Sequence, residues 1–354
     1  MVDGLRRWGW DDGMEQAFAP LRADGLAAAR IVLEDRGRYR LQTADGERDA
    51  KVSGRLRHTA ESREELPAVG DWVAVRIEDE AATIHGVLPR RSRFVRKVAG
   101  PSTEPQVVAA NVDVVFVVVG LDREDKPRLI ERYLTVAWDS GARPVVLLNK
   151  ADLVTDVAER VAEIVPSALG VSLYAVSTRA PSGLDPLFRH LEPALTAAFL
   201  GPSGVGKSTI VNRLLGAEAQ RTGEVRAADH RGRHTTGRRQ LVALPGGALV
   251  IDTPGMRELQ LWDAEEGLTE TFADAAALAR ECRFRDCSHE DEPGCALREA
   301  VADGRFPAGR LASYHKLRRE LDDLGRRQEG WARKAERQKL RSLHRLANRH
   351  KPRE

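Results

Sequence analysis

The stretch GPSGVGKST, residues 201–209, matches the pattern G-x-x-x-x-G-K-[ST] at every fixed position. An apolar run, LTAAFL, precedes it and STIVNRLLG follows it, so the motif lies between a predicted strand and a predicted helix. In that context the glycines let the backbone wrap around phosphate groups, with the N–H groups of residues 204–208 pointing inward. Lys207 is expected to bridge the β- and γ-phosphates, and Ser208 to bind Mg²⁺. The stretch therefore predicts a nucleotide-binding α/β domain.

A second nucleotide-sensing element is predicted at DTPG, residues 252–255, which follows the apolar run GALVI. Asp252 is placed to hold Mg²⁺ through water, and the N–H of Gly255 to contact the γ-phosphate as part of switch II. A plain turn at the end of a strand is the alternative interpretation. Between the two motifs, RGRHTTG contains Thr235 and Thr236, either of which could close over Mg²⁺ and the γ-phosphate as switch I.

A guanine-recognition motif, LLNKAD at residues 147–152, comes before the phosphate loop in the chain. The carboxylate of Asp152 can accept hydrogen bonds from N1 and N2 of guanine, which adenine does not offer. We expect Asn149 to brace the loop, the stem of Lys150 to cover the base, and Ser177 in AVSTRAPSG to offer its backbone to the guanine. An ATP-dependent kinase or ATPase would require the NKAD motif to be a chance match.

The motifs occur in the order base loop, base-supporting loop, phosphate loop, switch I, switch II. Rotating this order gives an ordinary GTPase, so we predict a circularly permuted domain. The apolar runs VDVVFVVVG, RPVVLLNK and VSLYAVS, separated by helical stretches, are typical of parallel strands buried on both faces. The predicted GTP-binding residues are Asn149, Lys150, Ala151, Asp152, Ser177, Gly201, Pro202, Ser203, Gly204, Val205, Gly206, Lys207, Ser208, Thr209, Asp252 and Gly255.

The segment from Ala27 to Lys97 has a different pattern, with short alternating runs and a hairpin signal at Asp45-Gly46. About five short strands predict a small barrel, for which an OB-fold is the natural candidate. Basic side chains would decorate it, at Arg55, Arg57, Arg90, Arg91, Arg93, Arg96 and Lys97. An RNA-binding barrel and a purely structural barrel both fit this pattern.

All three cysteines of the chain fall in the stretch CRFRDCSHEDEPGC, residues 282–295. Cys282, Cys287 and Cys295 with His289 would make a closed tetrahedral Zn²⁺ site, with no open position for catalysis. The alternative is a group of buried free thiols beside a surface histidine. Clustering in a polar, acidic loop favours the structural zinc site, because buried free thiols are normally found in apolar surroundings.

The net charge of +3 conceals an asymmetry. Residues 326–354 contain 11 Lys or Arg and three Asp or Glu, which predicts attachment to a polyanion such as nucleic acid or, alternatively, a solvated helical face. An odd number of cysteines argues against a secreted disulfide framework, and no signal peptide is evident. The longest apolar runs have strand length, so we expect no membrane span and a cytoplasmic location.

With these residues assembled, the chain resembles the ribosome small subunit-dependent GTPase A family (RsgA, or YjeQ), whose members are circularly permuted bacterial GTPases. The resemblance rests on the cysteine cluster and on GRYRLQTADGERDAKVSGRLR, PAVGDWVAV, QVVAANVDVVFVV, RLIERYL, LLNKADL, GPSGVGKST, GRHTT and DTPGMRE. It implies an OB-fold domain, a permuted GTPase domain and a zinc domain. It also implies a role in late maturation of the 30S ribosomal subunit, contact with 16S rRNA, and GTP hydrolysis stimulated by that subunit.

The resemblance also suggests catalytic roles. Met256 follows DTPG where many GTPases place a glutamine that orients the attacking water, and a methionine cannot do so. The family implies His234 for that role, although packing within the loop is the alternative. Gly237 stands where the family often has a third threonine, and Thr236 is the preferred Mg²⁺ contact. The predicted catalytic set is His234, Lys207 and Thr236, with Ser208, Thr236 and Asp252 around Mg²⁺.

The predicted architecture is multidomain. It consists of an N-terminal segment with an OB-fold barrel at residues 1–100, a circularly permuted P-loop GTPase domain at 101–270, a mainly helical zinc-binding domain at 271–325 and a basic helical tail at 326–354. The predicted protein is a monomeric GTP hydrolase that binds GTP and GDP. The competing hypothesis is an RNA-binding scaffold whose nucleotide is structural and not hydrolysed, and the intact Mg²⁺ ligands favour the hydrolase.

Overall fold

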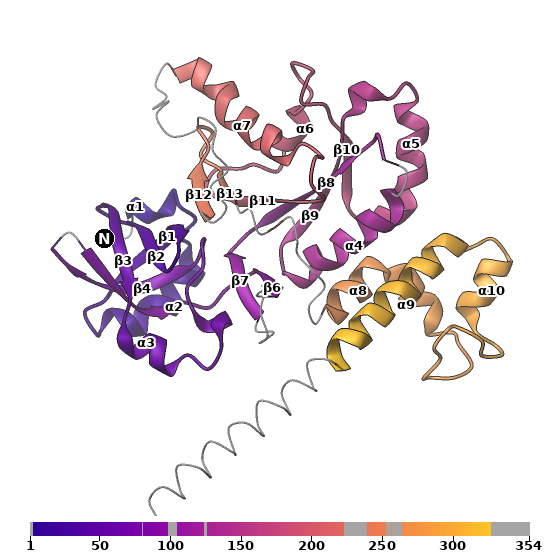
Figure 1. The fold of residues 1–354 in the computed structure, drawn as a ribbon, viewed down its shortest axis with the longest axis horizontal. Helices are drawn as coiled ribbons and strands as arrows, with labels where there is room; N and C mark the ends of the chain where they lie inside the picture. The colour runs from indigo at the N-terminus through magenta and orange to yellow at the C-terminus, as the bar shows by residue number, and fades with distance from the viewer. Residues whose placement is uncertain are drawn as a thin grey trace, which may run out of the picture.

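The computed structural model describes residues 3–79, 81–97, 105–123, 126–222, 239–252, 256 and 264–326. Three regions follow one another in space as they do in the chain: a β-barrel, an α/β domain and a helical carboxyl region (Figure 1). The predicted switch I stretch and the basic tail beyond Arg326 lie outside the described residues. No helix in the described part of the chain has both the length and the apolar character needed to span a membrane.

The barrel is closed by five strands in the order β1-β2-β3-β5-β4, with β4 pairing back onto β1. Alternate residues of these strands fill its interior, and β3 runs parallel to β5 while the other neighbours are antiparallel, as in an OB-fold. The predicted hairpin at Asp45-Gly46 is confirmed, since Thr43 pairs with Gly46. The strands are β1 (Ala27–Asp35), β2 (Arg38–Thr43), β3 (Gly46–Val52), β4 (Trp72–Glu78) and β5 (Ala81–Val87).

Two short helices close one side of the barrel. Met14 and Phe18 of the second helix, with Trp10 just before it, pack around the buried Trp72 of β4, and the rings of Trp10 and Trp72 meet edge to face at 4.8 Å. The Asp11 side chain caps the second helix by accepting from the N–H of Met14. The helical elements of this region are α1 (Asp3–Arg6), α2 (Asp12–Arg22), α3 (Gly54–Thr59) and η1 (Arg63–Glu65).

A two-stranded hairpin, β6 (Arg93–Lys97) and β7 (Pro105–Ala110), leads from the barrel into the α/β domain. The predicted domain boundary after residue 100 falls between these two paired strands. Five parallel strands and one antiparallel strand then form the sheet, in the order β10-β9-β8-β11-β13-β12. They are β8 (Val114–Gly120), β9 (Arg143–Asn149), β10 (Ser172–Ala175), β11 (Thr196–Leu200), β12 (Arg239–Ala243) and β13 (Leu249–Asp252).

Helices cover both faces of this sheet, which explains the continuous apolar runs. In β8 every residue is buried, and odd-numbered residues from Val115 to Val119 pack in the cluster that contains α4 and α5. Even-numbered residues from Val114 to Val118 pack toward α6 and α7. The helical elements are α4 (Lys126–Asp139), η2 (Ala151–Leu153), α5 (Val157–Ile164), η3 (Val165–Ala168), α6 (Asp185–Phe188) and α7 (Lys207–Thr222).

The circular permutation is visible in the sheet order. The strand that precedes the phosphate loop, β11, is fourth in the domain's sequence but lies at its centre, between β8 and β13. If β8, β9 and β10 were moved behind β13 in the chain, every strand pairing would stay the same. The rotated order changes where the chain enters and leaves, and leaves the packed sheet intact.

The helical carboxyl region docks on α4. It contains α8 (Glu265–Thr271), α9 (Ala273–Ala279), α10 (Ala296–Ala302) and a helix over residues 308–326. The buried Arg310 ties it down, since Nη1 donates to Glu131 of α4 at 2.8 Å and Nη2 donates to the carbonyl of Thr271 at 2.8 Å. Its guanidinium also lies over the ring of Phe272, 4.6 Å from the centroid.

Candidate functional site

The strands that carry the predicted nucleotide motifs all end at one edge of the sheet. β9 ends at Asn149, β10 at Ala175, β11 at Leu200 and β13 at Asp252, and the four run parallel. The carboxyl edge of an open parallel sheet is where such folds bind ligands, because the loops there diverge between helices. The base loop, base-supporting loop, phosphate loop and the start of switch II therefore meet at one place.

The phosphate loop has the backbone that its glycines allow. Gly201, Gly204 and Gly206 have φ of 140°, 79° and 97°, which side-chain-bearing residues rarely adopt. A Cβ on Gly206 would lie 2.4 Å from Nδ2 of Asn149. That nitrogen donates to the carbonyl of Val205 at 2.8 Å, so the base loop braces the phosphate loop directly. The remaining predicted residues of this stretch, Pro202, Ser203, Ser208 and Thr209, lie in the loop and the first turn of α7.

Lys207, the first residue of α7, folds its side chain back over the loop. Its Nζ donates to the carbonyls of Gly201 at 2.6 Å and Pro202 at 2.7 Å. A triphosphate in the loop would offer the same ammonium charged oxygens in place of neutral ones. The lysine is thus held over the space that the loop encloses, within reach of the phosphates expected there.

The base loop turns sharply at Lys150, whose φ is 64°, and places Ala151 and Asp152 in the short helix η2. The hydroxyl of Ser177 donates to Oδ1 of Asp152 at 2.5 Å, and this hydrogen bond lowers the pKa of the carboxyl group. The carboxylate is therefore ionised and oriented, which is the state that accepts from guanine N1 and N2. Ser177 in turn accepts from the N–H of Arg179 at 3.1 Å.

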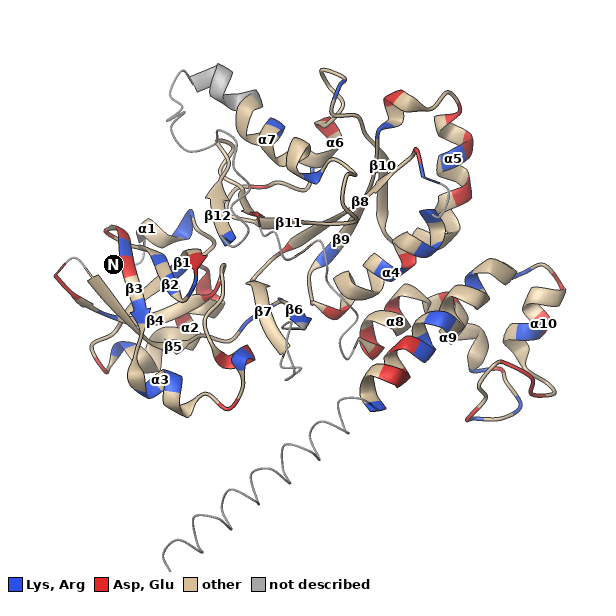
Figure 2. Cartoon of the chain, in the orientation of Figure 1, with Lys and Arg blue, Asp and Glu red and all other residues tan. Residues whose placement is uncertain are grey.

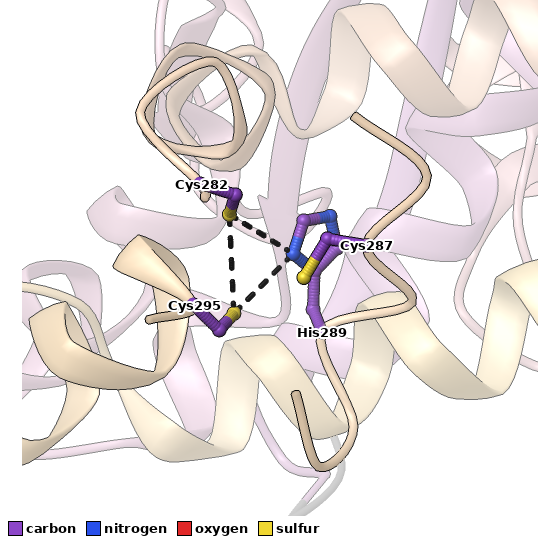
Figure 3. A group of neighbouring side chains, drawn as sticks. All are labelled: Cys282, Cys287, His289 and Cys295. Atoms are coloured by element: carbon purple, nitrogen blue, oxygen red, sulfur yellow. Dashed lines mark hydrogen bonds between the residues drawn. The ribbon is translucent and has the colours of Figure 1, made fainter. Parts of the chain in front are cut away.

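The four predicted zinc ligands converge in the segment between α9 and α10 of the carboxyl region (Figure 3). Nδ1 of His289 lies 3.5 Å from Sγ of Cys282 and 3.4 Å from Sγ of Cys295, and the two sulfurs are 4.0 Å apart. With Zn–S near 2.3 Å and Zn–N near 2.0 Å, a tetrahedron requires about 3.5 Å between N and S and about 3.8 Å between sulfurs. One donor atom from each of the four residues lies within 4.8 Å of the others, which fits a tetrahedral metal ion.

The chemistry of this cluster also suits a cation. Burial, together with the neighbouring cysteine sulfurs, raises the pKa of the Cys287 thiol to about 12. Crowded thiols lose their protons readily only when a positive charge is bound among them. The loop between the ligands is shaped by Glu292, which accepts from the N–H and hydroxyl of Ser288 at 2.8 and 2.6 Å.

Comparison with known proteins identifies the family. The sequence profile described as RsgA GTPase matches residues 87–262. A small ribosomal subunit biogenesis GTPase, RsgA, from Opitutus terrae is 47% identical over 351 residues, which cover 96% of this chain and 96% of that protein. The protein of the same name from Streptomyces coelicolor is 45% identical and covers 89% of this chain and 86% of its own length. The chain belongs to the RsgA GTPase family.

Solved structures agree with this assignment. YjeQ from Thermotoga maritima is 27% identical, with a TM-score of 0.65 over 84% of this chain and 98% of that one. YloQ, described as a circularly permuted GTPase, shares the fold with a TM-score of 0.61 at 24% identity, over 84% of this chain and 96% of its own. The predicted fold class, with its barrel, permuted α/β domain and helical metal-cluster region, is confirmed, and so is the prediction of a GTPase.

Some residues of this RsgA-family site were not predicted from sequence. Asp122, two residues beyond β8, forms an ion pair with Nζ of Lys150 at 2.7 Å. It thereby holds the Lys150 side chain, which is expected to cover the base. Its only signal in the sequence is its place after the strand next to β9, which brings it to the same edge of the sheet. From the sequence alone, an aspartate that pairs with Lys150 cannot be distinguished from an aspartate that only faces solvent.

Three predictions concern residues outside the described part of the chain: His234, Thr235 or Thr236 as the magnesium contact, and Gly255. Met256, which is described, is only 1% exposed and belongs to the core cluster that also contains Ala264 and Leu268. This methionine is thus a packing residue. Asp252 is exposed at the end of β13, and Gln240 pairs with it from β12.

The prediction of an exposed basic surface was wrong for one residue, Arg90. Arg90 does not decorate the barrel, because it is paired with the fully buried Asp71 at 2.7 Å and donates to the carbonyl of Leu66 at 2.9 Å. Arg91 remains partly exposed but is paired with Asp11. Arg55 and Arg57 of α3 are exposed, the ribbon of that helix carries the colour of basic residues in Figure 2, and Arg93 is also exposed.

Proposed function

We propose that this chain hydrolyses GTP at the carboxyl edge of its sheet and acts in late maturation of the 30S ribosomal subunit, which stimulates the hydrolysis. The observation that carries the nucleotide assignment is the meeting of two loops there, with the Ser177–Asp152 hydrogen bond in one and Lys207 in the other. The relatives are named as small ribosomal subunit biogenesis GTPases, which supports the 30S subunit as the partner. We further propose that the protein acts as a cytoplasmic monomer and contacts 16S rRNA.

The roles proposed for Asp152, Asn149 and Lys207 follow from the geometry of the loops, and those proposed for the magnesium ligands and His234 from the sequence motifs and the family resemblance. Asp152 selects guanine, Asn149 braces the phosphate loop, and Lys207 neutralises charge on the β- and γ-phosphates. Ser208, Asp252 and Thr236 are proposed to hold Mg²⁺, which supplies further charge neutralisation when bound. His234 is proposed to position the attacking water, a role that the buried Met256 leaves to another residue.

The Cys₃His cluster is proposed to hold one Zn²⁺ in a structural role. All four ligand positions are supplied by Cys282, Cys287, His289 and Cys295, so no position remains for a reacting water. The proposed domains are those expected from the sequence: 1–100 for the barrel region, 101–270 for the GTPase domain, 271–325 for the zinc domain and 326–354 for the basic tail. The boundary at residue 270 falls inside α8, a helix that lies with the carboxyl region.

The decisive experiment compares GTP hydrolysis by the purified protein with and without purified 30S subunits. Alone, a GTPase that lacks a positioned water should turn over at roughly 10⁻⁴ to 10⁻³ per second. We expect strong stimulation by 30S subunits at low salt and a steep fall with added salt, because basic residues would provide the attachment. Absence of stimulation at low salt would refute the ribosome-dependent function while leaving the GTPase assignment intact.

A single substitution tests the role proposed for His234 in positioning the attacking water. His234→Ala should keep GTP binding and 30S binding, and should lose most of the stimulated rate. If the variant is stimulated as strongly as the unchanged protein, His234 does not position the water.

A further inference from the structure

A single arginine of α7 joins the phosphate-loop helix to the base-supporting loop. Arg213 is half-buried, and its Nη1 donates to the carbonyl of Thr178. Its Nη2 donates to the carbonyls of Ala180 at 2.6 Å and Pro181 at 2.7 Å. Arg213 lies on the same helix as Lys207, so the loop beside the base is tied to the helix that begins at the phosphates.

The three carbonyls need this cation. They belong to Thr178, Ala180 and Pro181 and accept from one guanidinium, an arrangement in which the oxygen dipoles repel one another unless a donor lies between them. A guanidinium offers five N–H groups in a planar fork, whereas a lysine ammonium is a compact point charge that cannot span them in the same geometry. Removing the guanidinium would leave the loop without its common hydrogen-bond donor.

Other forces on this loop are weak. Residues 179–182 are all exposed, so apolar burial does not fix their position. The loop is closed on its far side by the N–H of Gly183, which donates to Ala180 at 3.2 Å, and by the N–H of Ser177, which donates to Gly183 at 3.3 Å. These bonds shape the loop internally. Its two ends are held by Val176 and Leu184, which pack in the same apolar cluster as α7, and Arg213 joins the exposed residues between them to that helix.

The position of the loop matters because of Ser177. The same serine orients the Asp152 carboxylate through its hydroxyl and accepts from the N–H of Arg179 in the loop. A shift of the loop therefore moves both the backbone expected to face the guanine and the hydrogen bond that orients Asp152. The base site and the phosphate site belong to one nucleotide, so their separation must match its length.

We propose that Arg213 is a positioning residue for guanine selection, which sets the base-supporting loop at a fixed distance from the phosphate-loop helix. The proposal rests on the guanine site proposed above. Arg213 touches the loop backbone and not the nucleotide, so its loss should weaken the recognition of the base and leave the contacts to the phosphates in place.

The test measures equilibrium affinity for GDP and GTP, and for ADP and ATP by competition, in Arg213→Met and Arg213→Lys. We expect guanine nucleotide affinity to fall about 10- to 100-fold in Arg213→Met, the equivalent of losing about one charge-assisted hydrogen bond to the base. Adenine nucleotide affinity should not change, so the preference for guanine falls by the same factor. The guanine nucleotide affinity of Arg213→Lys should lie between those of the unchanged protein and Arg213→Met, because lysine keeps the charge without the planar fork of N–H groups.

The matched control is Arg132→Lys. Arg132 also uses both terminal nitrogens, on Glu320 at 2.6 and 2.7 Å, but it joins α4 to the carboxyl helix. The Arg132→Lys variant should keep the preference for guanine over adenine nucleotides unchanged. Melting temperature and zinc content establish that each variant is folded.

Three outcomes would overturn the proposal. Equal losses for guanine and adenine nucleotides in Arg213→Met would show that the arginine supports the helix and not the base loop. Unchanged GTP affinity would show that the loop keeps its place without it. If the unchanged protein itself does not prefer GTP to ATP, the guanine site is wrong, and the role of Arg213 fails with it.

Discussion

The Asp152 carboxylate is the residue on which guanine selection should depend most directly. Asp152→Asn replaces an acceptor with an amide that can present a donor to guanine N1 and N2. We expect GTP affinity to fall at least about 100-fold, since hydrogen bonds to charged groups contribute about 1.5 to 3 kcal/mol each. Xanthosine nucleotides, which carry an oxygen at position 2, should bind better to the variant than to the unchanged protein. Competition binding with GDP and XDP measures both effects, and normal GTP binding by the variant would refute the assignment of guanine recognition to Asp152.

At the residue scale, sequence was informative where a motif is local. Asn149 was expected to brace the loop, because NKxD carries a fixed geometry within a few residues, and the structure shows that its side chain donates to Val205 of the phosphate loop. Asp122, Arg213 and Arg310 were not predicted. Each acts on a partner 28 or more residues away, and nothing in the sequence near an arginine or aspartate tells which backbone it will reach.

At the scale of elements, α8 and α4 approach each other at Gly267. A Cβ there would lie 2.1 Å from the carbonyl oxygen of Thr135 and 2.8 Å from the backbone N of Asp139. Both are backbone atoms of α4, so neither can move aside without shifting the helix. The carboxyl region therefore depends on a glycine to dock, and nothing in the sequence around Gly267 indicates this close approach.

Gly267→Ala should separate α8 from α4. Overpacking of a tight contact typically costs about 1 to 3 kcal/mol, so we expect a clear fall in melting temperature and faster proteolysis after the GTPase domain. Gly216→Ala is the matched control, because Gly216 lies in α7 with nothing within 4 Å of an added Cβ. There, alanine should be neutral or stabilise the helix by up to about 1 kcal/mol. Equal melting temperatures for the two variants would contradict the close-approach argument.

The metal cluster should hold the carboxyl region together. Its helices are short, α9 and α10 having seven residues each, and such helices are marginal without tertiary support. Cys287→Ala removes one ligand and should unfold this region locally, while GTP binding persists. Metal analysis of the dialysed protein should give about one zinc per chain. Finding no zinc, with all three thiols freely titratable, would refute the structural site.

At the scale of the whole molecule, the barrel and the α/β sheet form one sheet of 11 strands. The junction is a short antiparallel pairing of β1 with β12, where Leu33 faces Gln240. Gln240 also pairs with Asp252 on the opposite side. Only β12 therefore separates β1 of the barrel from β13, whose last residue, Asp252, is proposed to hold Mg²⁺. Sequence predicted both domains but not this pairing, because strands of different domains show no signal of their mutual register.

An ion pair seals this junction, and breaking it should destabilise the molecule. Arg239 and Glu34 meet at 2.7 Å with side chains only 9% and 13% exposed. Arg239→Met leaves the carboxylate unpaired, which typically costs about 3 to 5 kcal/mol in buried pairs. The double variant Glu34→Gln with Arg239→Met removes both charges and should recover much of the lost melting temperature. If the destabilisation of the double variant equals the sum of those of Glu34→Gln and Arg239→Met, the two side chains are not coupled.

The same pair predicts a dependence on pH. Burial raises the pKa of Glu34 above its usual value despite the opposing effect of Arg239. In Arg239→Met that opposing effect is gone, so the pKa should rise further. A raised carboxyl pKa means that the folded state binds the proton more tightly than the unfolded state, so its contribution to stability is present below the unfolded pKa and lost as pH rises through the folded pKa. The melting-temperature deficit of Arg239→Met relative to the unchanged protein should therefore be larger near about pH 8 than near about pH 5. The double variant, which has no carboxyl group at position 34, should show no such difference, and a deficit in Arg239→Met that is equal at both values would show that Glu34 is solvated in the variant.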